Sequence, residues 1–338
     1  MGGCCSCQVT FGGRVHDMDS ESDHDHHNDN TYVDGNDGSR ILLGESSKFI
    51  SMYCQKGRKG PNQDALTVWE DFTGEKGTIF CGVFDGHGPL GHEFAQCLSD
   101  NLPSKLSEAI KMSQQNASYY GENKQNMSPD SWEGSFLRSF FEMDEGLAQN
   151  IDTDGFSGGS TAVTLIKQGN QLIIGNLGDS RAVLCTRADD NHFVPVQLTV
   201  DLKPDIPSET LRIVNCGGRV FDAEEDPGVK RIWMPEDDCP GLAMSRAFGD
   251  FCLKNCGLTT VPDLFYRKIS KQDQFVVLAT DGVWDVLTNN EVITIVASAP
   301  KRSMAARMLV KRAVQAWRFK YPTSEVDDCA VICLFLNE

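Results

Sequence analysis

Residues 82–88 have the sequence Gly-Val-Phe-Asp-Gly-His-Gly and close an apolar run that begins at Ile79. Such a run is typical of a buried strand, and its end predicts a tight turn that presents Asp85. Gly86 has no side chain, so its backbone carbonyl can come close to a ligand, while His87 can exchange a proton near neutral pH. Taken alone, the stretch fits a hydrolytic cation site and a solvated Asp-Gly turn equally well.

Three later stretches favour the cation site. The segment 275–285 repeats the pattern, because its apolar run ends in Asp281 and a glycine. Asp179 lies in a turn between two apolar runs, and Asp327 comes shortly before the apolar run 329–336. Carboxylates at several strand ends destabilise one another unless a cation compensates them. Because all the candidate ligands are oxygen atoms, the set favours Mg²⁺ or Mn²⁺ over Zn²⁺.

Seven motifs in a fixed order give the chain a family resemblance. They occupy residues 60–64, 83–88, 158–162, 178–181, 242–250, 280–285 and 327–328. Together they resemble the motifs of the metal-dependent type 2C protein serine/threonine phosphatases of the plant kind, over roughly residues 48–337. This resemblance implies an α+β fold, a four-layer α-β-β-α sandwich in which helices flank two central antiparallel sheets.

The resemblance also implies roles for individual residues. Two Mg²⁺ or Mn²⁺ ions per subunit would activate a water molecule for attack on phosphoserine or phosphothreonine. Asp85 would bridge the two metals, and His87 would be the acid for the leaving oxygen. The other implied metal ligands are the Gly86 carbonyl, Asp281, Asp327, Asp64 acting through water, and Asp179 with Asp285 at a weaker third metal.

Two positions depart from the family pattern. The family holds the substrate phosphate with an arginine five residues before its first aspartate, whereas this chain has Lys59 there and Arg58 beside it. Lysine offers a point charge where arginine offers a bidentate fork, so either Lys59 or Arg58 can take this role. Asp328 stands where the family has asparagine, and we therefore expect Asp327 to be the metal ligand.

Other phosphatase chemistries fit the sequence less well. A cysteine phosphatase needs an arginine six positions after its cysteine, and no cysteine of this chain has one. The Asp-Thr-Asp-Gly stretch at 152–155 lacks the preceding buried strand of the aspartyl-nucleophile enzymes, so we expect a turn there. The alternative function is a membrane-tethered, catalytically weak phosphatase-like binding module. Lys59 is its only support, because all the expected aspartates are present.

Composition limits the domain organisation and the partners. The chain has 338 residues, is 40% hydrophobic and carries a net charge of -17, which argues against a nucleic-acid partner. Residues 1–44 predict a disordered acidic tail, and residues 45–338 predict one catalytic domain that acts as a monomer. Helical spacing predicts helices at 92–111 and 134–150, separated by a polar loop.

Short apolar runs predict the pairing of three strands. The runs lie at 161–166, 171–176 and 181–185, and only a few residues link them. Links of this length predict antiparallel pairing between consecutive strands. The pattern therefore excludes a parallel nucleotide-binding sheet.

The N-terminus fits an acylation signal. Gly2 and Ser6 match the N-myristoylation pattern, and Cys4, Cys5 and Cys7 are candidate palmitoylation sites. The chain has no signal peptide and no apolar run of transmembrane length. We therefore expect peripheral attachment to the cytoplasmic face of the plasma membrane, or otherwise a place in the cytoplasm or nucleus. The expected partners are phosphorylated proteins, including membrane-associated kinases or transporters.

Overall fold

The computed structural model describes residues 32–34, 39–42, 49–119, 127–151, 158–224 and 226–337. The acylation residues Gly2, Cys4 and Cys5 and the predicted turn at 152–155 lie outside these ranges. Two short strands, β1 (Tyr32–Asp34) and β2 (Ser39–Leu42), fall within the segment 1–44, and β2 pairs in parallel with β4 (Asp64–Glu70).

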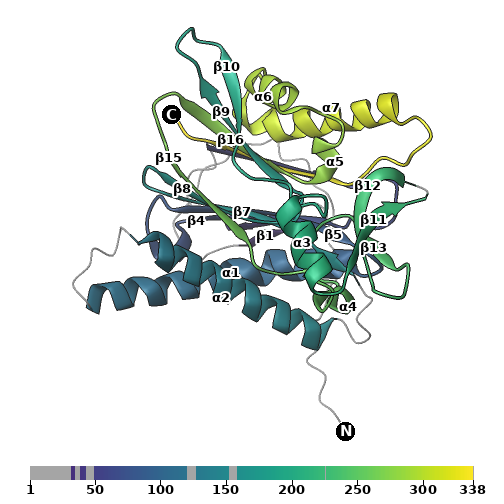
Figure 1. Cartoon of the computed structure of the whole chain (residues 1–338). Coiled ribbons are helices and arrows are strands. Elements are labelled where there is room, and N and C mark those ends of the chain that lie inside the picture. Colours follow the sequence, from purple (N-terminus) through teal and green to yellow (C-terminus); the bar gives the residue numbers. More distant parts are fainter. Residues whose placement is uncertain are drawn as a thin grey trace. The chain divides into compact units, whose positions relative to one another are not determined.

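Two sheets form the centre of the fold (Figure 1). The larger has the strand order β1-β2-β4-β5-β7-β8-β15, with β6 pairing β5 and β14 pairing β6; the smaller has the order β10-β9-β16-β17-β3. The remaining strands of the larger sheet are β5 (Ile79–His87), β6 (Gly159–Ser160), β7 (Ala162–Gln168), β8 (Gln171–Leu177), β14 (Phe248–Gly249) and β15 (Asp263–Lys268). The strands of the smaller sheet are β3 (Ile50–Gln55), β9 (Arg181–Arg187), β10 (Phe193–Gln197), β16 (Asp273–Ala279) and β17 (Cys329–Phe335). Apart from β2 with β4, every pairing is antiparallel.

Helices cover the outer face of each sheet. The helices α1 (Gly91–Tyr119) and α2 (Pro129–Asn150) share a core with the larger sheet, in which Phe94 and Phe140 are buried together with Phe84. On the smaller sheet, α6 (Asn289–Ala297) and α7 (Ala305–Lys320) form a second core. The short helix η3 (Arg302–Met304) comes directly before α7. The four-layer sandwich predicted from the sequence is therefore confirmed.

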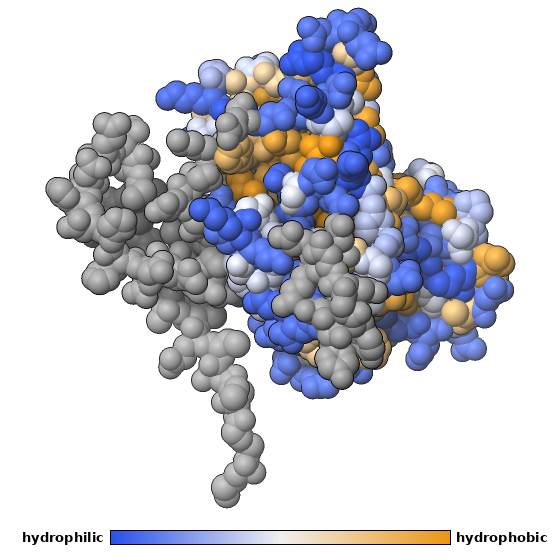
Figure 2. All heavy atoms as spheres, turned by 90° about the vertical axis from the view of Figure 1, so that its left-hand side faces the viewer, coloured by the Kyte–Doolittle hydropathy of each residue, from blue (hydrophilic) through white to orange (hydrophobic). Residues whose placement is uncertain are grey.

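A third core lies between the two sheets. Val83 and Val163 of the larger sheet meet Val276 and Ile332 of the smaller one, and all four are fully buried. The partly buried rim of this core includes Val196, Phe265, Ile269 and Leu336. Figure 2, in which the left-hand side of Figure 1 faces the viewer, shows a group of hydrophobic side chains within a mostly hydrophilic surface.

The link at residues 178–180 differs from the sequence prediction. Antiparallel pairing of β8 with β9 was expected, and this is wrong, because β8 pairs with β7 and β15 while β9 pairs with β10 and β16. Gly178 has φ 100°, a conformation that glycine adopts without strain. The link therefore carries the chain from one sheet to the other, and Ile174 and Leu184 pack into the same core between them.

The predicted polar loop between the first two helices begins later than expected. Residues 112–119 continue α1, so the helix does not end at 111. Two of their polar side chains have partners: Ser113 Oγ lies 3.0 Å from Ser135 Oγ, and Gln114 Nε2 donates to Glu75 Oε1 at 3.1 Å. Polar composition alone predicted a loop here because it could not reveal these contacts.

A smaller unit lies beside the sandwich. It contains α3 (Pro207–Asn215), β11 (Arg219–Ala223), β12 (Asp226–Trp233), β13 (Pro240–Leu242) and α4 (Phe251–Lys254) (Figure 1). Ile213, Ile232 and Leu253 form its own core. The Trp233 ring stacks on Phe221 at 5.0 Å, and its Nε1 donates to the Phe221 carbonyl at 2.9 Å. This tryptophan therefore packs onto the domain.

Candidate active site

Strands of both sheets deliver carboxylates to one place. Asp64, the first residue of β4, lies directly opposite Asp85 near the end of β5. On the smaller sheet, β16 continues through Thr280 into α5 (Asp281–Trp284), which begins with Asp281. Thr280 Oγ1 donates to Asp64 Oδ2 at 2.8 Å and thereby connects the two sheets inside the core.

Asp179 reaches the same region from the link between β8 and β9. Its Oδ2 accepts a hydrogen bond from Lys203 Nζ at 2.7 Å. Its Oδ1 is buried and has no hydrogen-bond partner within the described part of the chain. A buried carboxylate oxygen without a partner is costly, so this atom is suited to a cation. Asp285 lies at the C-terminal end of α5.

The two aspartates before β17 have different surroundings. Asp328 is buried, and its carboxylate accepts hydrogen bonds from the backbone N–H groups of Gly57 (2.6 Å) and Gln63 (2.8 Å). Asp327 instead forms an ion pair with Lys59. Asp328 therefore holds the loop before β4 in place, whereas Asp327 faces the carboxylate cluster.

Lys59 and Arg58 also differ in their surroundings. The charges of Asp327, Asp281 and Asp85 raise the pKa of Lys59, although burial by itself lowers it. Both side chains are exposed, but Lys59 forms the ion pair with Asp327, while the backbone N–H of Arg58 donates to the Val326 carbonyl at 2.8 Å. The lysine therefore lies within the field of the cluster.

The carboxylates perturb one another strongly. Burial raises the pKa of Asp85 well above its usual range, and the charges of Asp281 and Asp64 raise it further. Burial likewise raises the pKa of Asp281, with additional contributions from Asp179 and Asp285. Neighbouring buried carboxylates of this kind are a common sign of a functional site.

The arrangement fits hard divalent cations. All the candidate donors are oxygen atoms. The backbone is closely packed at Gly86: an added Cβ would lie 2.1 Å from the Gly91 carbonyl oxygen, so only glycine fits there. Among the residues that the structure describes, no three histidine, cysteine or carboxylate side chains are grouped closely enough to hold a metal by themselves. Mg²⁺ usually keeps several waters and is bound through one or two carboxylates. The oxygen donors therefore suit Mg²⁺ or Mn²⁺ better than Zn²⁺, which favours nitrogen and sulfur ligands.

His87 is held by Asp250, a residue to which we assigned no role from the sequence. The short strands β6 and β14 pair beside the end of β5 and bring Asp250 next to the imidazole. His87 Nε2 lies 2.6 Å from Asp250 Oδ2. Burial lowers the pKa of His87, but the charge and hydrogen bond of Asp250 outweigh it and raise the pKa. The other ring nitrogen, Nδ1, is buried without a partner in the described part of the protein.

Asp250 is itself supported by a second carboxylate. Asp144 Oδ1 accepts from the backbone N–H of Gly249 at 2.8 Å, and Asp144 Oδ2 pairs with Lys254 at 2.9 Å. The only sequence signal for Asp250 was its place at the end of the motif 242–250. Its 163-residue separation from His87 gave no indication of their contact.

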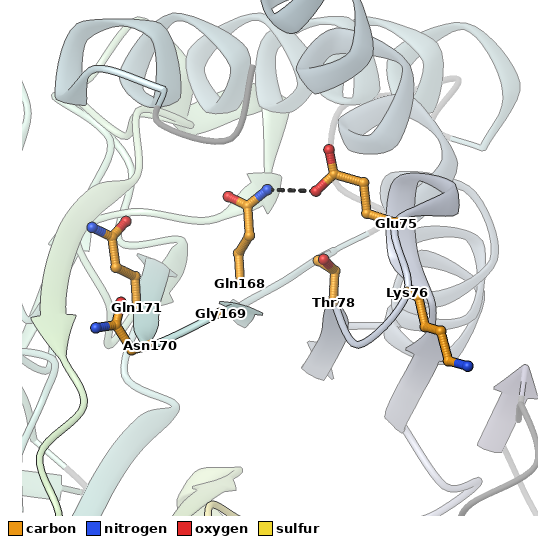
Figure 3. A pocket seen from close by; sticks show the side chains of 7 residues that line it. All are labelled: Glu75, Lys76, Thr78, Gln168, Gly169, Asn170 and Gln171. Atoms are coloured by element: carbon orange, nitrogen blue, oxygen red, sulfur yellow. Dashed lines mark hydrogen bonds between the residues drawn. The ribbon is translucent and has the colours of Figure 1, made fainter. Parts of the chain in front are cut away.

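A pocket of about 560 Å³ lies away from these residues, where the β4–β5 loop meets the β7–β8 hairpin (Figure 3). Its lining is polar and consists of Glu75, Lys76, Thr78, Gln168, Gly169, Asn170 and Gln171. Gln168 Nε2 donates to Glu75 Oε2 at 2.7 Å across it. Because Thr78 precedes the start of β5 and His87 ends the strand, the pocket and the carboxylates lie at opposite ends of the sheet.

The fold and the strand-end carboxylates define a class of protein: a metal-dependent hydrolase of phosphate esters. Residues 50–317 match the family model described as Protein phosphatase 2C, and the chain belongs to this family. It is therefore a protein serine/threonine phosphatase of the kind that depends on Mg²⁺ or Mn²⁺.

Comparison with known proteins agrees with this assignment. The chain is 55% identical to "Probable protein phosphatase 2C 65" of Arabidopsis thaliana over 311 residues, covering 90% of this chain and 80% of the relative. It is 52% identical to "Probable protein phosphatase 2C 73" of Oryza sativa subsp. japonica over 304 residues, covering 85% and 72%. The fold resembles serine-threonine phosphatase 2C from Toxoplasma gondii, with a TM-score of 0.71 at 23% identity and coverage of 85% and 94%.

Proposed function

We propose that this phosphatase hydrolyses phosphoserine and phosphothreonine at the carboxylate cluster, where it holds two Mg²⁺ or Mn²⁺ ions and a weaker third. When bound, such ions lower the pKa of a water molecule and neutralise phosphoryl oxygens. The observation that carries the proposal is the meeting of buried carboxylates from both sheets: Asp64 lies opposite Asp85, Thr280 beside Asp281 bonds to Asp64, and Asp179 Oδ1 is buried without a partner in the described part of the chain. In this proposal the residues that hold the metals are Asp85, the Gly86 carbonyl, Asp281, Asp327 and Asp64 through water, with Asp179 and Asp285 at the third.

His87 would donate the proton that the serine or threonine oxygen needs as it leaves. Asp250 holds Nε2 and stabilises the protonated ring, which leaves Nδ1 as the atom that gives up its proton. Lys59 would bind the substrate phosphate, because it forms an ion pair with Asp327 and, against the effect of burial, the charges of Asp327, Asp281 and Asp85 raise its pKa. A phosphate oxygen would then share Lys59 with Asp327.

The metal part of the proposal has a direct test. Asp85→Asn and Asp281→Asn should each abolish release of phosphate from a phosphothreonine peptide, with unchanged circular dichroism. EDTA should silence the wild type, and Mn²⁺ should restore it. The exposed Asp189 provides the matched control, because Asp189→Asn removes an equal charge and should leave activity intact. Full activity of the wild type in EDTA would refute the metal mechanism.

The proton donor is tested with two substrates. His87→Ala should slow hydrolysis of the phosphothreonine peptide by a factor of about 10²–10⁴, the usual contribution of a general acid. The loss should be far smaller on p-nitrophenyl phosphate, whose leaving group needs little protonation. Equal losses on both substrates would show that His87 positions the substrate instead.

We also infer acylation of the N-terminus, which the described residues do not include. Within them, no helix is long and apolar enough to cross a bilayer. A single myristoyl chain on Gly2 gives only marginal binding, and residues 1–38 contain one arginine against eight acidic residues. A second chain on Cys4, Cys5 or Cys7 would therefore stabilise attachment. The acidic tail would then be a spacer that lets the catalytic domain reach membrane-associated phosphoproteins, such as kinases or transporters.

Cell fractionation tests this anchor. Gly2→Ala, expressed with an untouched N-terminus, should move the protein to the cytosol. The triple change Cys4→Ser, Cys5→Ser and Cys7→Ser should leave it myristoylated but loosely bound. An anchor of this kind is contradicted if the Gly2→Ala protein stays with membranes as well as the wild type does.

A further inference from the structure

The helix layer on the smaller sheet carries positive charge in a strongly acidic chain. Residues 292–324 contain seven lysines and arginines and no aspartate or glutamate, whereas the whole chain has a net charge of -17. The seven are Lys301, Arg302, Arg307, Lys311, Arg312, Arg318 and Lys320. The rest of the chain is thus even more acidic than the total, so the composition does not explain this concentration of cations.

The exposed side of α7 collects most of these cations. Leu309, Ala313 and Trp317 are buried against the smaller sheet. Helical spacing turns a different side outward, and there Arg307, Lys311, Arg312 and Arg318 are all exposed. With Lys301 and Arg302, which come just before α7, these residues form a surface that we name the basic face.

The cations of the basic face lack acidic partners. None of the six forms an ion pair with any carboxylate that the structure describes. Their contacts are neutral: Arg302 lies over the Phe335 ring at 5.1 Å and Arg307 over the Tyr53 ring at 5.8 Å. Lys320 is not part of the basic face, because its Nζ donates to the Val286 carbonyl at 2.7 Å.

Several arginines elsewhere in the described structure are neutralised by carboxylates. Arg246 pairs with both Glu209 and Asp263, and Arg181 pairs with Asp201. Those arginines stabilise the fold, whereas the positive charge of the basic face remains available to an external anion.

Two apolar side chains accompany the basic face. Phe319, in the last turn of α7, is 88% exposed, and Met304, just before its first turn, is 47% exposed. A helix that presents cations together with exposed aromatic or aliphatic side chains is typical of proteins that lie on a membrane surface. A surface that serves only solubility gains nothing from an exposed phenylalanine.

We propose that the basic face is a docking surface for the anionic lipid headgroups of a membrane, with Phe319 and Met304 entering the interface. We choose anionic lipid as the partner because its negative charge is complementary to the positive charge of the basic face. The surface is the outer side of a helix, and the described pockets of about 560, 470 and 250 Å³ are lined by residues outside the basic face. An acidic peptide is recognised by a groove or a closed arginine cluster, whereas a lipid surface needs only dispersed cations and apolar side chains.

This docking mode leaves the active site open. The carboxylates lie at strand ends, whereas α7 covers the outer face of the smaller sheet (Figure 1). A membrane against the basic face would therefore not cover Asp85, and the acidic remainder of the domain would be repelled from the lipid. The inference deepens the proposed membrane attachment, but it needs no acyl chain.

Vesicle co-sedimentation of the full chain, made in cells that cannot acylate it, tests the proposal. The vesicles contain phosphatidylcholine with 30% phosphatidylserine, or phosphatidylcholine alone, at 0.1 M salt, where the Debye length is about 10 Å. The wild type should bind only the anionic vesicles. Each cation near such a surface contributes about fivefold in affinity, so Lys311→Glu with Arg312→Glu should weaken binding at least roughly 25-fold.

A matched pair separates the basic face from general charge. Lys268 and Lys271 are exposed on and after β15, outside the helix layer, and Lys268→Glu with Lys271→Glu makes the same change in net charge. This pair should weaken binding less than about threefold. Both pairs should keep wild-type activity on p-nitrophenyl phosphate, which shows that they fold.

Three results would overturn the proposal: no binding of the wild type to anionic vesicles, equal losses in the two pairs, or retention on polyglutamate without vesicle binding. The last would assign the basic face to acidic protein segments. Because the protein in this assay carries no acyl chain, these outcomes are independent of whether Gly2→Ala releases the protein in cells.

Discussion

Asp250→Asn tests the part that Asp250 would play in the proposed proton donation by His87. The substitution keeps the shape of the side chain but removes the charge 2.6 Å from His87 Nε2. A hydrogen bond to a charged group contributes about 1.5–3 kcal/mol, and 1.36 kcal/mol is one pKa unit, so the pKa of His87 should fall by about 1–2 units. A general acid works in its protonated form, so the alkaline decline in kcat should move to lower pH by the same amount. At a pH above both values, kcat should fall roughly 10- to 100-fold.

The assay compares kcat from pH 6 to 9 on a phosphothreonine peptide and on p-nitrophenyl phosphate at saturating Mn²⁺. The loss should appear on the peptide and be small on p-nitrophenyl phosphate. Adding Asp250→Asn to His87→Ala should have little further effect, because the two residues act as one unit. The exposed pair of Asp190 and His192 supplies the control, since Asp190→Asn breaks a similar contact away from the site. An unshifted pH profile in Asp250→Asn would refute the reasoning.

Three further predictions follow from individual contacts. Gly86→Ala places a Cβ 2.1 Å from the Gly91 carbonyl oxygen, so it should lower the free energy of unfolding by about 1–3 kcal/mol and abolish activity; normal kcat and melting temperature would contradict this. Glu209 is buried, and although burial raises its pKa, hydrogen bonds from Arg246, Ser245 and Arg212 lower it to about 2. The stabilisation of the fold by ionised Glu209 is therefore complete above the ordinary pKa near 4.5 and is lost as the pH falls towards 2. Urea titrations should show that Glu209→Gln lowers the free energy of unfolding by at most roughly 3 kcal/mol at pH 7 and by progressively less at low pH. Lys203 donates to Asp179 and would compete with the cation proposed there, so Lys203→Gln should lower the Mn²⁺ concentration needed for half-maximal activity by roughly fivefold; an increase would contradict the competition.

Local patterns in the sequence predicted strands, helices and the carboxylates at strand ends, because these depend on short-range signals, whereas the four-layer arrangement was implied only by the family resemblance. An apolar run that ends in Asp-Gly identifies a strand and the residue at its end, as for Asp85 and Asp281. The crossing at Gly178 could not be predicted, because a three-residue link can join neighbouring strands or opposite sheets, and only the burial of both strands in one core decides between them.

Contacts between distant parts of the chain were also beyond the sequence. Nothing local distinguishes Asp250, which holds His87, from an ordinary loop aspartate. The same is true of Asp328, whose carboxylate accepts hydrogen bonds from two backbone N–H groups that lie more than 260 residues earlier in the chain. In both cases the partner is brought close by the pairing of other strands.

The position of β17 has a consequence for the making of this protein on the ribosome. This strand lies between β16 and β3, and the residues just before it hold Gly57 and Gln63, which are among the first parts of the domain to be translated. The smaller sheet cannot close, and the loop before Asp64 has no anchor, until residue 335 has left the exit tunnel. The nascent chain therefore carries most of its proposed metal ligands well before the smaller sheet can close, and we expect a chain that ends shortly before β17 to have the motifs of a phosphatase without its activity.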